Sequence, residues 1–569
     1  MQKEIEKISR LIDAASGNKK IELLICNVKY LSVTTGEWLL GNIAIDDGMI
    51  VGVGNEEYEA ETRIDATGLY ASPGFIDTHV HLESVHASPF EFEKAVLPRG
   101  TTTAVCDPHE LANVCGKAAI KWFLDCSESM VMDLRVQLSS CVPATHLETS
   151  GAKLSAGDLA EFMDHPSAGG LAELMNYPGV LYKDAEVLEK IALFKNRGID
   201  GHAPLVNSKN LNAYIASGVS NDHECTNSEE ALEKIRKGMV ILIREGSVSK
   251  DIDSLYSIIN PQTLPYTALC TDDRGILDIV KDGHIDYLIR KLIKNGVPSH
   301  LAYSAASYSG ALAHKMYDRG MIAPGKIADI VLLENLKECK IKSVYKRGKK
   351  VDEELKKPLS SVDVSFALNS LRCEEISEKD LAIFSKKSNT PVIEIIENSL
   401  ITNRIDIDLP IEDGEKKAIP QDDVLKLAVI CRYGEKNIGK AFVKGFKLKG
   451  GALASSVGHD SHNICVVGTN DGDMVMAVNE LIHSGGGYVI VDSGKVLAKV
   501  EFPVGGLISL SSTDELVLQF SKLHEETAKL SPVGNPFLQM AFLPLPVIPF
   551  LKLTDKGLVD VVKFCFVEE

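Results

Sequence analysis

The sequence predicts a (β/α)8 barrel of the TIM type, combined with a small β-sandwich domain and a C-terminal α+β domain. Three observations lead to this prediction. Short apolar runs alternate with helix-like segments between Pro73 and about Gly310, and polar residues stand at the end of nearly every run. The chain also lacks the GxGxxG turn that is typical of a doubly wound sheet. At 569 residues the chain is also too long for one hydrophobic core.

Eight strand-like runs can be counted in the central region. Helix-like segments fill the gaps between them, for example residues 184–198 and 228–238. The runs cover residues 74–81, 101–109, 134–144, 169–176, 198–204, 218–224, 239–247 and 266–273. A succession of eight β–α repeats is typical of the barrel.

The segments that flank the barrel predict the other domains. Residues 1–20 have the pattern of an amphipathic helix. Residues 21–72 contain short β-rich runs separated by Gly, Asn and Asp, and residues 318–368 return to β structure. We expect these two segments to form one small β-sandwich. Residues 73–317 are then the barrel, and residues 369–569 a separate C-terminal domain.

Composition limits the classes of partner. The formal net charge of −18 argues against general binding to nucleic acid or to anionic membranes. The 12 cysteines include no CxxC pair, which favours reduced thiols in a cytoplasmic protein. Prolines 544, 546 and 549 interrupt the apolar stretch at residues 536–553, so we expect a buried loop or edge structure there and no membrane span.

Two histidines alternate in the first predicted barrel strand, in the stretch THVH at residues 78–81. Alternate side chains share one face of a strand, so both imidazoles point into the barrel mouth. Taken alone, such a pair is more often a set of ordinary polar or core histidines. Other strand ends change this interpretation, because His202, His223 and Asp272 follow three further predicted strands. Convergence of these side chains on one cavity predicts a metal centre that includes His79 and His81.

The fourth predicted strand carries a carboxylate, Glu173, in the run GGLAELMN. A charged side chain in an apolar strand is costly unless it meets a cation. Two neighbouring divalent cations need a bridging anion, and this strand offers no lysine that could be carbamylated. Glu173 is therefore the predicted bridge, and a salt bridge to an arginine is the structural alternative.

Imidazole and carboxylate ligands suit Zn, Fe or Mn, and the sequence does not choose among them. Two such ions lower the pKa of a water between them, and Asp272 can accept its proton while it coordinates. This chemistry predicts a hydrolase that attacks a planar carbon bearing a leaving group.

Around these residues the chain resembles the metal-dependent amidohydrolase superfamily. The shared features are the HxH after PGFID, the later single histidines, the last-strand aspartate and the stretch GMIAPGKIADIVLL. Within that superfamily it resembles the adenine deaminase family, through HLESVHASPFEFEKAVLPRGTTTAVCDPHELANVCG, AELMNYPGV, GHAP, SNDHE, TDDR and KAFVKGFKLKGGALASSVGHDSHNICVVGTND. The resemblance covers nearly the whole chain after the first 20 or so residues.

The resemblance implies hydrolytic deamination of adenine to hypoxanthine and ammonia. It implies two divalent metal ions per chain, Mn²⁺ or Fe²⁺, with Zn²⁺ as a third option. Glu173 would replace the carbamylated lysine that bridges the metals in many relatives. The implied ligands are His79, His81, Glu173, His202, His223 and Asp272.

Attack on C6 makes that carbon tetrahedral, so N1 needs a proton and the amino group must leave protonated. Asp272 is the expected carrier of a proton toward the leaving ammonia. Three carboxylates are candidates for protonating N1 or recognising the purine, although each could instead orient a metal-bound imidazole: Glu110, Glu224 and Glu245. Three more residues are expected to support the ligands from behind: Asp77, Asp107 and His109.

Some residues depart from the family pattern or lie outside the predicted centre. Val85 and His86 replace the Ser and Met that usually follow HLES, and His86 lies close enough to the barrel mouth to alter substrate contacts. GHDSHN replaces a commoner version that begins with Ala. For its His459 and His462 we expect a structural or interface role and no second metal site.

Two other functions stay open at this point. The first is another amidohydrolase, such as a cyclic amidase, a phosphosugar deacetylase or a deaminase of a different base. A phosphosugar would need a cluster of basic residues, and Arg244 and Arg274 are the only obvious candidates. The second is a non-catalytic barrel scaffold, which should have lost ligands; none is missing here. We expect a homo-oligomer, with a dimer as the first guess.

Overall fold

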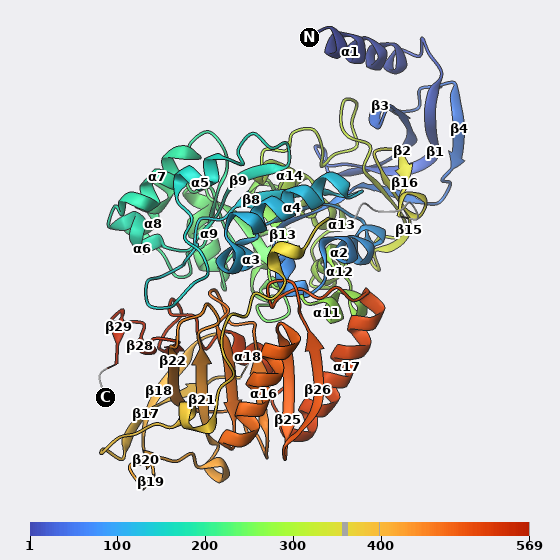
Figure 1. Ribbon diagram of the computed structural model, residues 1–569. Helices are drawn as coiled ribbons and strands as arrows, with labels where there is room; N and C mark the ends of the chain where they lie inside the picture. Colours follow the sequence, from blue (N-terminus) through green and yellow to red (C-terminus); the bar gives the residue numbers. More distant parts are fainter. Residues whose placement is uncertain (356–361, 398, 568–569) are drawn as a thin grey trace.

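The computed structural model describes residues 1–355, 362–397 and 399–567. Figure 1 shows a β-sheet and the helix α1 (Gln2–Ala15) at one end of the molecule, the barrel in the middle and an α+β region at the other end. This architecture confirms the predicted fold class. The domain boundaries given above stay predictions.

Within the described residues, the barrel has eight parallel strands. They are β6 (Phe75–Val80), β7 (Thr101–Cys106), β8 (Asp133–Leu138), β9 (Ala168–Leu174), β10 (Ile199–Gly201), β11 (Asn221–Asp222), β12 (Val240–Arg244) and β13 (Thr267–Cys270). Backbone hydrogen bonds join β6 to β10 in one ladder and β11 to β13 in another. The ladders meet where Asp272 N donates to His79 O (2.9 Å) and where Ser220 N donates to Ile199 O (3.0 Å), so the barrel closes.

The strands β10 and β11 are shorter than the predicted runs because side chains replace part of their ladder. Asn221 Oδ1 accepts from Gly201 N (3.1 Å), and Asp222 Oδ1 accepts from Ala203 N (2.8 Å). These bonds satisfy backbone N–H groups that a longer ladder would pair. The next residue after each short strand is a histidine, which leaves the sheet and faces the cavity.

Helices cover the outside of the barrel. Three of them begin at polar caps that accept from free N–H groups: Ser88 Oγ from Glu91 N (3.3 Å), Asp184 Oδ1 from Val187 N (3.1 Å) and Asn227 Oδ1 from Glu230 N (3.0 Å). The barrel helices are α2 (Pro89–Val96), α3 (His109–Cys115), α4 (Lys117–Ser129), α5 (Ala156–Ala160), α6 (Tyr177–Leu181), α7 (Ala185–Leu193), α8 (Ser208–Ala216), α9 (Ser228–Arg236), α10 (Ile252–Leu255), α11 (Ile276–Lys281), α12 (Ile285–Lys294), α13 (Ser299–Ala305) and α14 (Tyr308–Ala313).

The small sheet takes strands from both flanks of the barrel. Its order is β16-β15-β14-β5-β1-β2-β3, and β4 pairs with β1. The sheet folds over its own apolar core, because Ala328 N donates to Gly48 O (2.9 Å) and brings β3 back toward β14. The strands are β1 (Ile21–Ser32), β2 (Glu37–Asp46), β3 (Met49–Gly54), β4 (Ala60–Asp65), β5 (Tyr70–Pro73), β14 (Ile330–Asn335), β15 (Lys340–Lys346) and β16 (Lys349–Lys350).

The C-terminal region is built on a second mixed sheet, in the order β18-β17-β22-β21-β24-β23-β25-β26. The helix α16 (Asp471–Ser484) packs on one face through Met474, Ala477 and Leu481. The other face belongs to the same apolar core as the barrel. The strands are β17 (Asn389–Ile395), β18 (Thr402–Asp408), β21 (Val424–Ile430), β22 (Ile438–Lys444), β23 (Ala452–Ser455), β24 (Ile464–Gly468), β25 (Gly487–Asp492) and β26 (Lys495–Glu501).

The last segments of the chain lie against the barrel mouth. The helices α17 (Thr513–Leu530) and α18 (Pro536–Ala541) precede the hairpin of β27 (Leu551–Thr554) and β28 (Gly557–Asp560). The proline-rich stretch between α18 and β27 is irregular and buried up to Pro546. No helix in the described part of the chain combines the length and apolar character needed to cross a bilayer.

Candidate metal centre and active site

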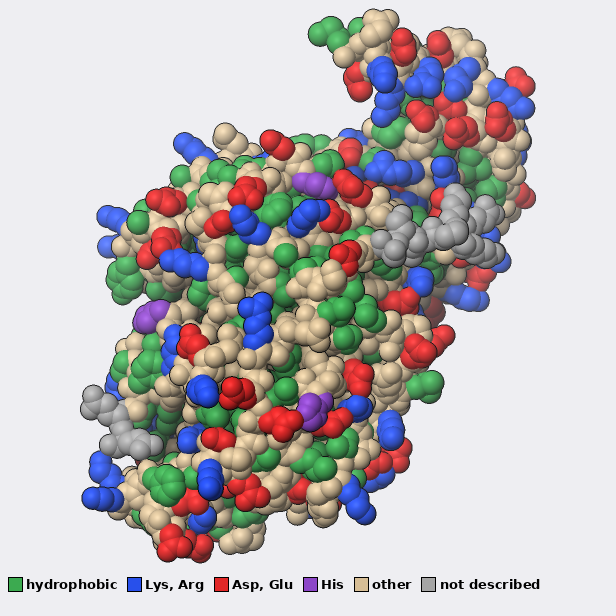
Figure 2. Space-filling view, in the orientation of Figure 1, with side chains coloured by type: hydrophobic (Ala, Val, Ile, Leu, Met, Phe, Trp, Pro, Cys, Tyr) green, Lys and Arg blue, Asp and Glu red, His purple; other side chains and the backbone are tan. Residues whose placement is uncertain are grey.

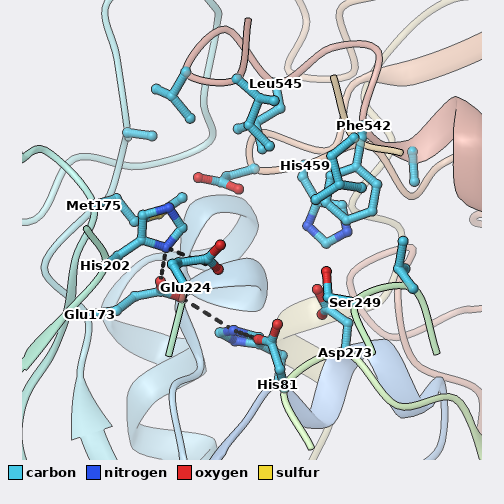
Figure 3. Close-up of a pocket in the computed structure, with 18 of the residues that line it drawn as sticks. His81, Glu173, Met175, His202, Glu224, Ser249, Asp273, His459, Phe542 and Leu545 are labelled. Atoms are coloured by element: carbon cyan, nitrogen blue, oxygen red, sulfur yellow. Dashed lines mark hydrogen bonds and ion pairs between the residues drawn. The ribbon is translucent and has the colours of Figure 1, made fainter. Parts of the chain in front are cut away.

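A cavity of about 2170 Å³ lies between the C-terminal ends of the barrel strands and the C-terminal region. The barrel contributes His81, Glu173 and His202 to its lining, and the C-terminal region contributes His459 and Phe542. Figure 3 shows these side chains around one space, with Glu173 and His202 on one side and Asp273 and His459 on the other. The site is therefore built from both halves of the molecule.

The histidines of THVH lie side by side, as the strand alternation predicts, and His81 lines the cavity. His79 lies in β6 and His81 follows it, and their side chains are only 1% and 3% exposed. The two Nε2 atoms are 3.1 Å apart. His81 Nδ1 lies 3.1 Å from Asp107 O, an acceptor only, so Nδ1 carries the proton and Nε2 is free to bind a cation.

Glu173 lies at the end of β9 between two pairs of imidazoles. Its Oε1 is 3.3 Å from His81 Nε2 and 3.7 Å from His79 Nε2. Its Oε2 is 2.7 Å from His202 Nδ1 and 3.4 Å from His223 Nε2. One carboxylate thus faces both pairs, which is the arrangement that a bridging ligand needs.

Asp272 closes the cluster from the end of β13. Its Oδ1 lies 3.2 Å from His81 Nε2 and 3.6 Å from His79 Nε2, while Arg244 Nη1 donates to its Oδ2 (3.1 Å). Burial alone would raise the pKa of this carboxyl, but hydrogen bonds from the two imidazoles and the charge of Arg244 hold it well below its usual range. Asp272 is therefore ionised.

The donor set fits divalent cations. The ligand atoms of His79, His81 and Asp272 lie within 4.8 Å of one another, as do those of His79, Glu173 and His223. Hydrogen bonds from the imidazoles of His202, His223 and His81 hold the pKa of Glu173 well below its usual range despite burial. Buried imidazoles that converge on ionised carboxylates are the ligands that first-row divalent ions prefer.

The three residues expected to support the ligands, Asp77, Asp107 and His109, make different contacts, and His109 itself lines the cavity. Asp107 Oδ2 lies 3.0 Å from His109 Nδ1, which fixes that ring next to Glu173 Oε1 at 3.6 Å. Asp77 accepts from the Thr271 hydroxyl (2.5 Å) and lies 3.0 Å from His284 Nε2. Asp77 therefore connects β6 to the residue that follows β13 and reaches His79 only at its backbone N (3.4 Å).

The three candidate carboxylates have different surroundings. Glu224 lines the cavity, forms an ion pair with Arg244 and lies 3.4 Å from His223 Nε2. Glu110 also lines the cavity, at the start of α3, and contacts imidazoles of the C-terminal region. Glu245 is directed away from the cavity, because its carboxylate pairs with Lys291 (2.6 Å) and accepts from Ile252 N (3.3 Å). This placement does not support the expected contact between Glu245 and the substrate.

His86 lines the cavity at its rim, as expected from its position in the sequence. Its Nδ1 lies 3.0 Å from Leu507 O and its Nε2 lies 3.1 Å from Tyr488 OH. The ring also stacks on Phe502 at 4.6 Å between centroids. Both nitrogens are thus used in contacts with the C-terminal region, and burial lowers the pKa of His86 to about 4, so this histidine is a neutral part of the interface.

Sequence reasoning missed some of the cavity residues. Asp273 lies beside Asp272 and accepts from Ser84 Oγ (2.5 Å). The stretch TDDR contained a signal for it, namely a second carboxylate at a strand end. The position of His459 in the cavity had no comparable signal, because it depends on how the C-terminal sheet docks on the barrel.

Comparisons with known proteins identify the family of the chain. The Amidohydrolase family profile matches residues 70–351, so the class is an amidohydrolase whose barrel holds a site suited to divalent metals. The Adenine deaminase C-terminal domain profile matches residues 399–565. The chain is 48% identical to an adenine deaminase of Gluconobacter oxydans over 98% of this chain and 99% of that one. It is also 48% identical to adenine deaminase 1 of Rhizobium meliloti, over 99% of this chain and 100% of that one. The chain belongs to the adenine deaminase family.

Proposed function

We propose that the protein deaminates adenine hydrolytically, giving hypoxanthine and ammonia. The observation that carries this proposal is the convergence of four histidines, Glu173 and Asp272 at the cavity floor. The names of the relatives supply the substrate, since the similarity extends over the whole length of each chain. The reaction adds one water to C6 and releases the exocyclic amino group as ammonia.

The cluster divides into two halves that would each hold one divalent ion. His79, His81 and Asp272 form the first half, and His202 and His223 form the second. Glu173 lies between them with one oxygen toward each half. Two bound cations would supply a water that is nucleophilic at neutral pH and would polarise the substrate. We propose Mn²⁺ or Fe²⁺ as the native ions, with Zn²⁺ as a third option.

The chain's own residues would then handle the protons. Asp272 is ionised and can accept one proton at a carboxylate oxygen, while Arg244 holds the other oxygen in place. Glu224 faces the cavity and is ionised as well, because the charges of Arg244, His202 and His223 hold its pKa below the usual value despite burial. Glu224 can therefore bind a donor group of the purine or take a second proton, and Glu110 also lines the cavity.

The test is ammonia release from adenine together with hypoxanthine formation, with protein loaded with Mn²⁺ or Fe²⁺ under low oxygen. We expect turnover that disappears when a chelator strips the metal and returns on reloading. Two bound metals per chain without turnover of adenine would keep the hydrolase but contradict the substrate. No bound metal and no turnover would contradict the catalytic assignment altogether.

Two further expectations from the sequence stay proposals. A homodimer in solution is testable by size-exclusion chromatography with light scattering. A cytoplasmic location is testable by fractionating cells of the source organism.

A further inference from the structure

The carboxylate of Glu110 is held on both oxygens by histidines of the C-terminal region. His459 Nδ1 lies 2.5 Å from Oε1, and His462 Nε2 forms a hydrogen bond with Oε2. His109 Nε2 lies 3.4 Å from Oε1 as well. Glu110 is only 2% exposed although it borders the cavity. A carboxylate enclosed in this way orients imidazoles and has little capacity left for a substrate.

The hydrogen bonds define which nitrogen of His462 carries the proton. Gly458 N donates to His462 Nδ1 (3.2 Å), so Nδ1 is an acceptor and Nε2–H donates to Glu110. Burial lowers the pKa of His462 to about 4, which agrees with a neutral ring. His462 is not part of the cavity lining. It fixes Glu110 from the side that faces the protein interior.

His459 is held by Glu110 but faces the cavity. Its backbone N donates to Ala541 O (2.9 Å), and its ring stacks on Phe542 with 4.4 Å between centroids and 14° between planes. Its Nδ1 is used by Glu110, whereas no hydrogen bond to its Nε2 is found within the described residues. Figure 3 shows the nitrogen-bearing edge of the ring directed toward the part of the cavity where Asp273 lies, across from His202.

The surroundings of His459 suit a flat heterocycle. Phe542 and Leu545 of the proline-rich stretch form an apolar wall above the cluster, and Met175 lies on the opposite side (Figure 3). An apolar wall favours the faces of an aromatic base, and a fixed N–H at its edge favours a nitrogen acceptor in the plane of that base.

We propose that His459 of the C-terminal region is a substrate-contacting residue of the active site, which donates a hydrogen bond from Nε2–H to a ring nitrogen of the purine. In this assignment Glu110 is a positioning residue that holds Nδ1–H and thereby aims the ring. The inference rests on the proposed function for the identity of the base. It adds that the C-terminal region contributes a residue to the active site, whose other residues come from the barrel.

The charge of His459 fits this role. Burial lowers its pKa, but the carboxylate of Glu110 together with Asp273 and Asp460 more than compensates and raises it to about 9. At neutral pH both ring nitrogens then carry protons. His462, from the same loop, faces Glu110 as a neutral ring. A charged donor makes the shorter and stronger type of hydrogen bond to a neutral acceptor.

The decisive comparison is between His459→Asn and His459→Gln. The amide nitrogen of Asn lies near the place of Nδ1 and can hold Glu110, whereas that of Gln lies near the place of Nε2. If His459 contacts the base, His459→Asn lowers kcat/KM for adenine by about 10- to 100-fold, and His459→Gln keeps more of the activity. His459→Asn within about twofold of the parent would overturn the proposal, because Nε2 would then contribute nothing.

Three controls accompany these variants. Metal content and melting temperature must match those of the parent, which excludes loss of the cluster or of the fold. His483→Gln changes a histidine of α16 whose side chain is 60% exposed and pairs with Glu375, so this variant should keep full activity. Activity of the parent on adenine tests the proposed function, and only the ratio of variant to parent tests the contact.

A measurement on the parent protein covers the case in which a variant does not fold. We would record ¹⁵N spectra of histidine-labelled, Zn²⁺-loaded protein and add hypoxanthine, the product of the proposed reaction. The His459 Nε2 resonance, identified by its absence from the spectrum of whichever variant folds, His459→Asn or His459→Gln, should shift on binding. Binding of hypoxanthine without such a shift, or no binding at all, would overturn the proposal whether or not adenine is deaminated.

Discussion

The two carboxylate oxygens of Asp272 make different contacts. One carboxylate oxygen faces the imidazoles of His79 and His81, and the other accepts from Arg244. Its backbone N also donates to His79 O, which fixes the side chain at the point of barrel closure. Its φ of 51° turns the chain away from the strand there. The residue is thus placed by the closure of the barrel and by ion pairing together.

Replacement of this carboxylate should abolish turnover without unfolding the protein. We expect Asp272→Asn to lower kcat for adenine by at least about 10³-fold, because the amide keeps the shape but accepts no proton. His79→Ala should also abolish turnover, through loss of metal, which elemental analysis would detect. Circular dichroism spectra should stay close to those of the parent, because the fold is kept. Retained activity in either variant would contradict the site assignment, and Asp253→Asn, at an exposed carboxylate on α10, is the neutral control.

At the residue scale, the sequence was sufficient to predict the direction of a side chain wherever one local rule decides that direction. His79 and His81 share a face because strand alternation has a period of two. Glu173 could be picked out because a carboxylate stands in an apolar strand. Glu245 obeyed the same local pattern, yet Lys291 of α12 turns it away from the cavity. No local rule gives the position of a lysine 46 residues further along the chain.

At the element scale, the strand β27 carries a buried lysine beneath the wall of the cavity. Lys552 Nζ donates to Leu400 O (2.9 Å) and Phe542 O (3.0 Å), and no carboxylate pairs with it among the described residues. Burial therefore lowers its pKa to about 7. The lysine connects β27 to the residue that stacks on His459.

This lysine should make stability depend on pH. In the unfolded chain it keeps its proton up to its ordinary pKa near 10.5, but in the folded chain it releases the proton at about 7. Between these values the unfolded state binds more protons, so the free energy of unfolding rises with pH. Relative to Lys552→Met, the parent should gain stability from pH 7 to 10, with a slope of at most about 1.4 kcal/mol per pH unit. Denaturant titrations of both proteins over this range provide the check, and a constant difference between them would contradict the prediction.

The sequence predicts best the elements in which apolar residues recur at regular intervals. All eight barrel strands lie within or overlap the predicted runs, but β10 and β11 pair only briefly. Their shortening comes from Asn221 and Asp222, whose side chains bond to the neighbouring chain. The proline-rich stretch was expected to be buried loop, and it is buried up to Pro546, but its role as a cavity wall depends on contacts that composition does not reveal.

At the scale of the whole molecule, the barrel and the C-terminal region lie next to each other (Figure 1). They share one apolar core and one cavity. Polar contacts also cross this boundary: Thr513 N donates to Glu91 (2.8 Å), and Thr149 N donates to Asp555 (2.9 Å). Gly505, with φ at +66°, lies so close to Leu111 that a Cβ would be 2.2 Å from its Cδ1. The surface in Figure 2 is covered by interspersed acidic and basic side chains. Docking of the two halves was outside the reach of sequence reasoning, because it depends on shape complementarity between distant segments.

We propose that one cluster of imidazoles and carboxylates at the barrel mouth holds two metal ions. Diffraction data collected at the Mn absorption edge from crystals of the Mn²⁺-loaded protein test it most directly. We expect two anomalous peaks per chain, one beside His79, His81 and Asp272 and one beside His202 and His223, with Glu173 between them. A single peak, or peaks bound by other residues, would contradict it.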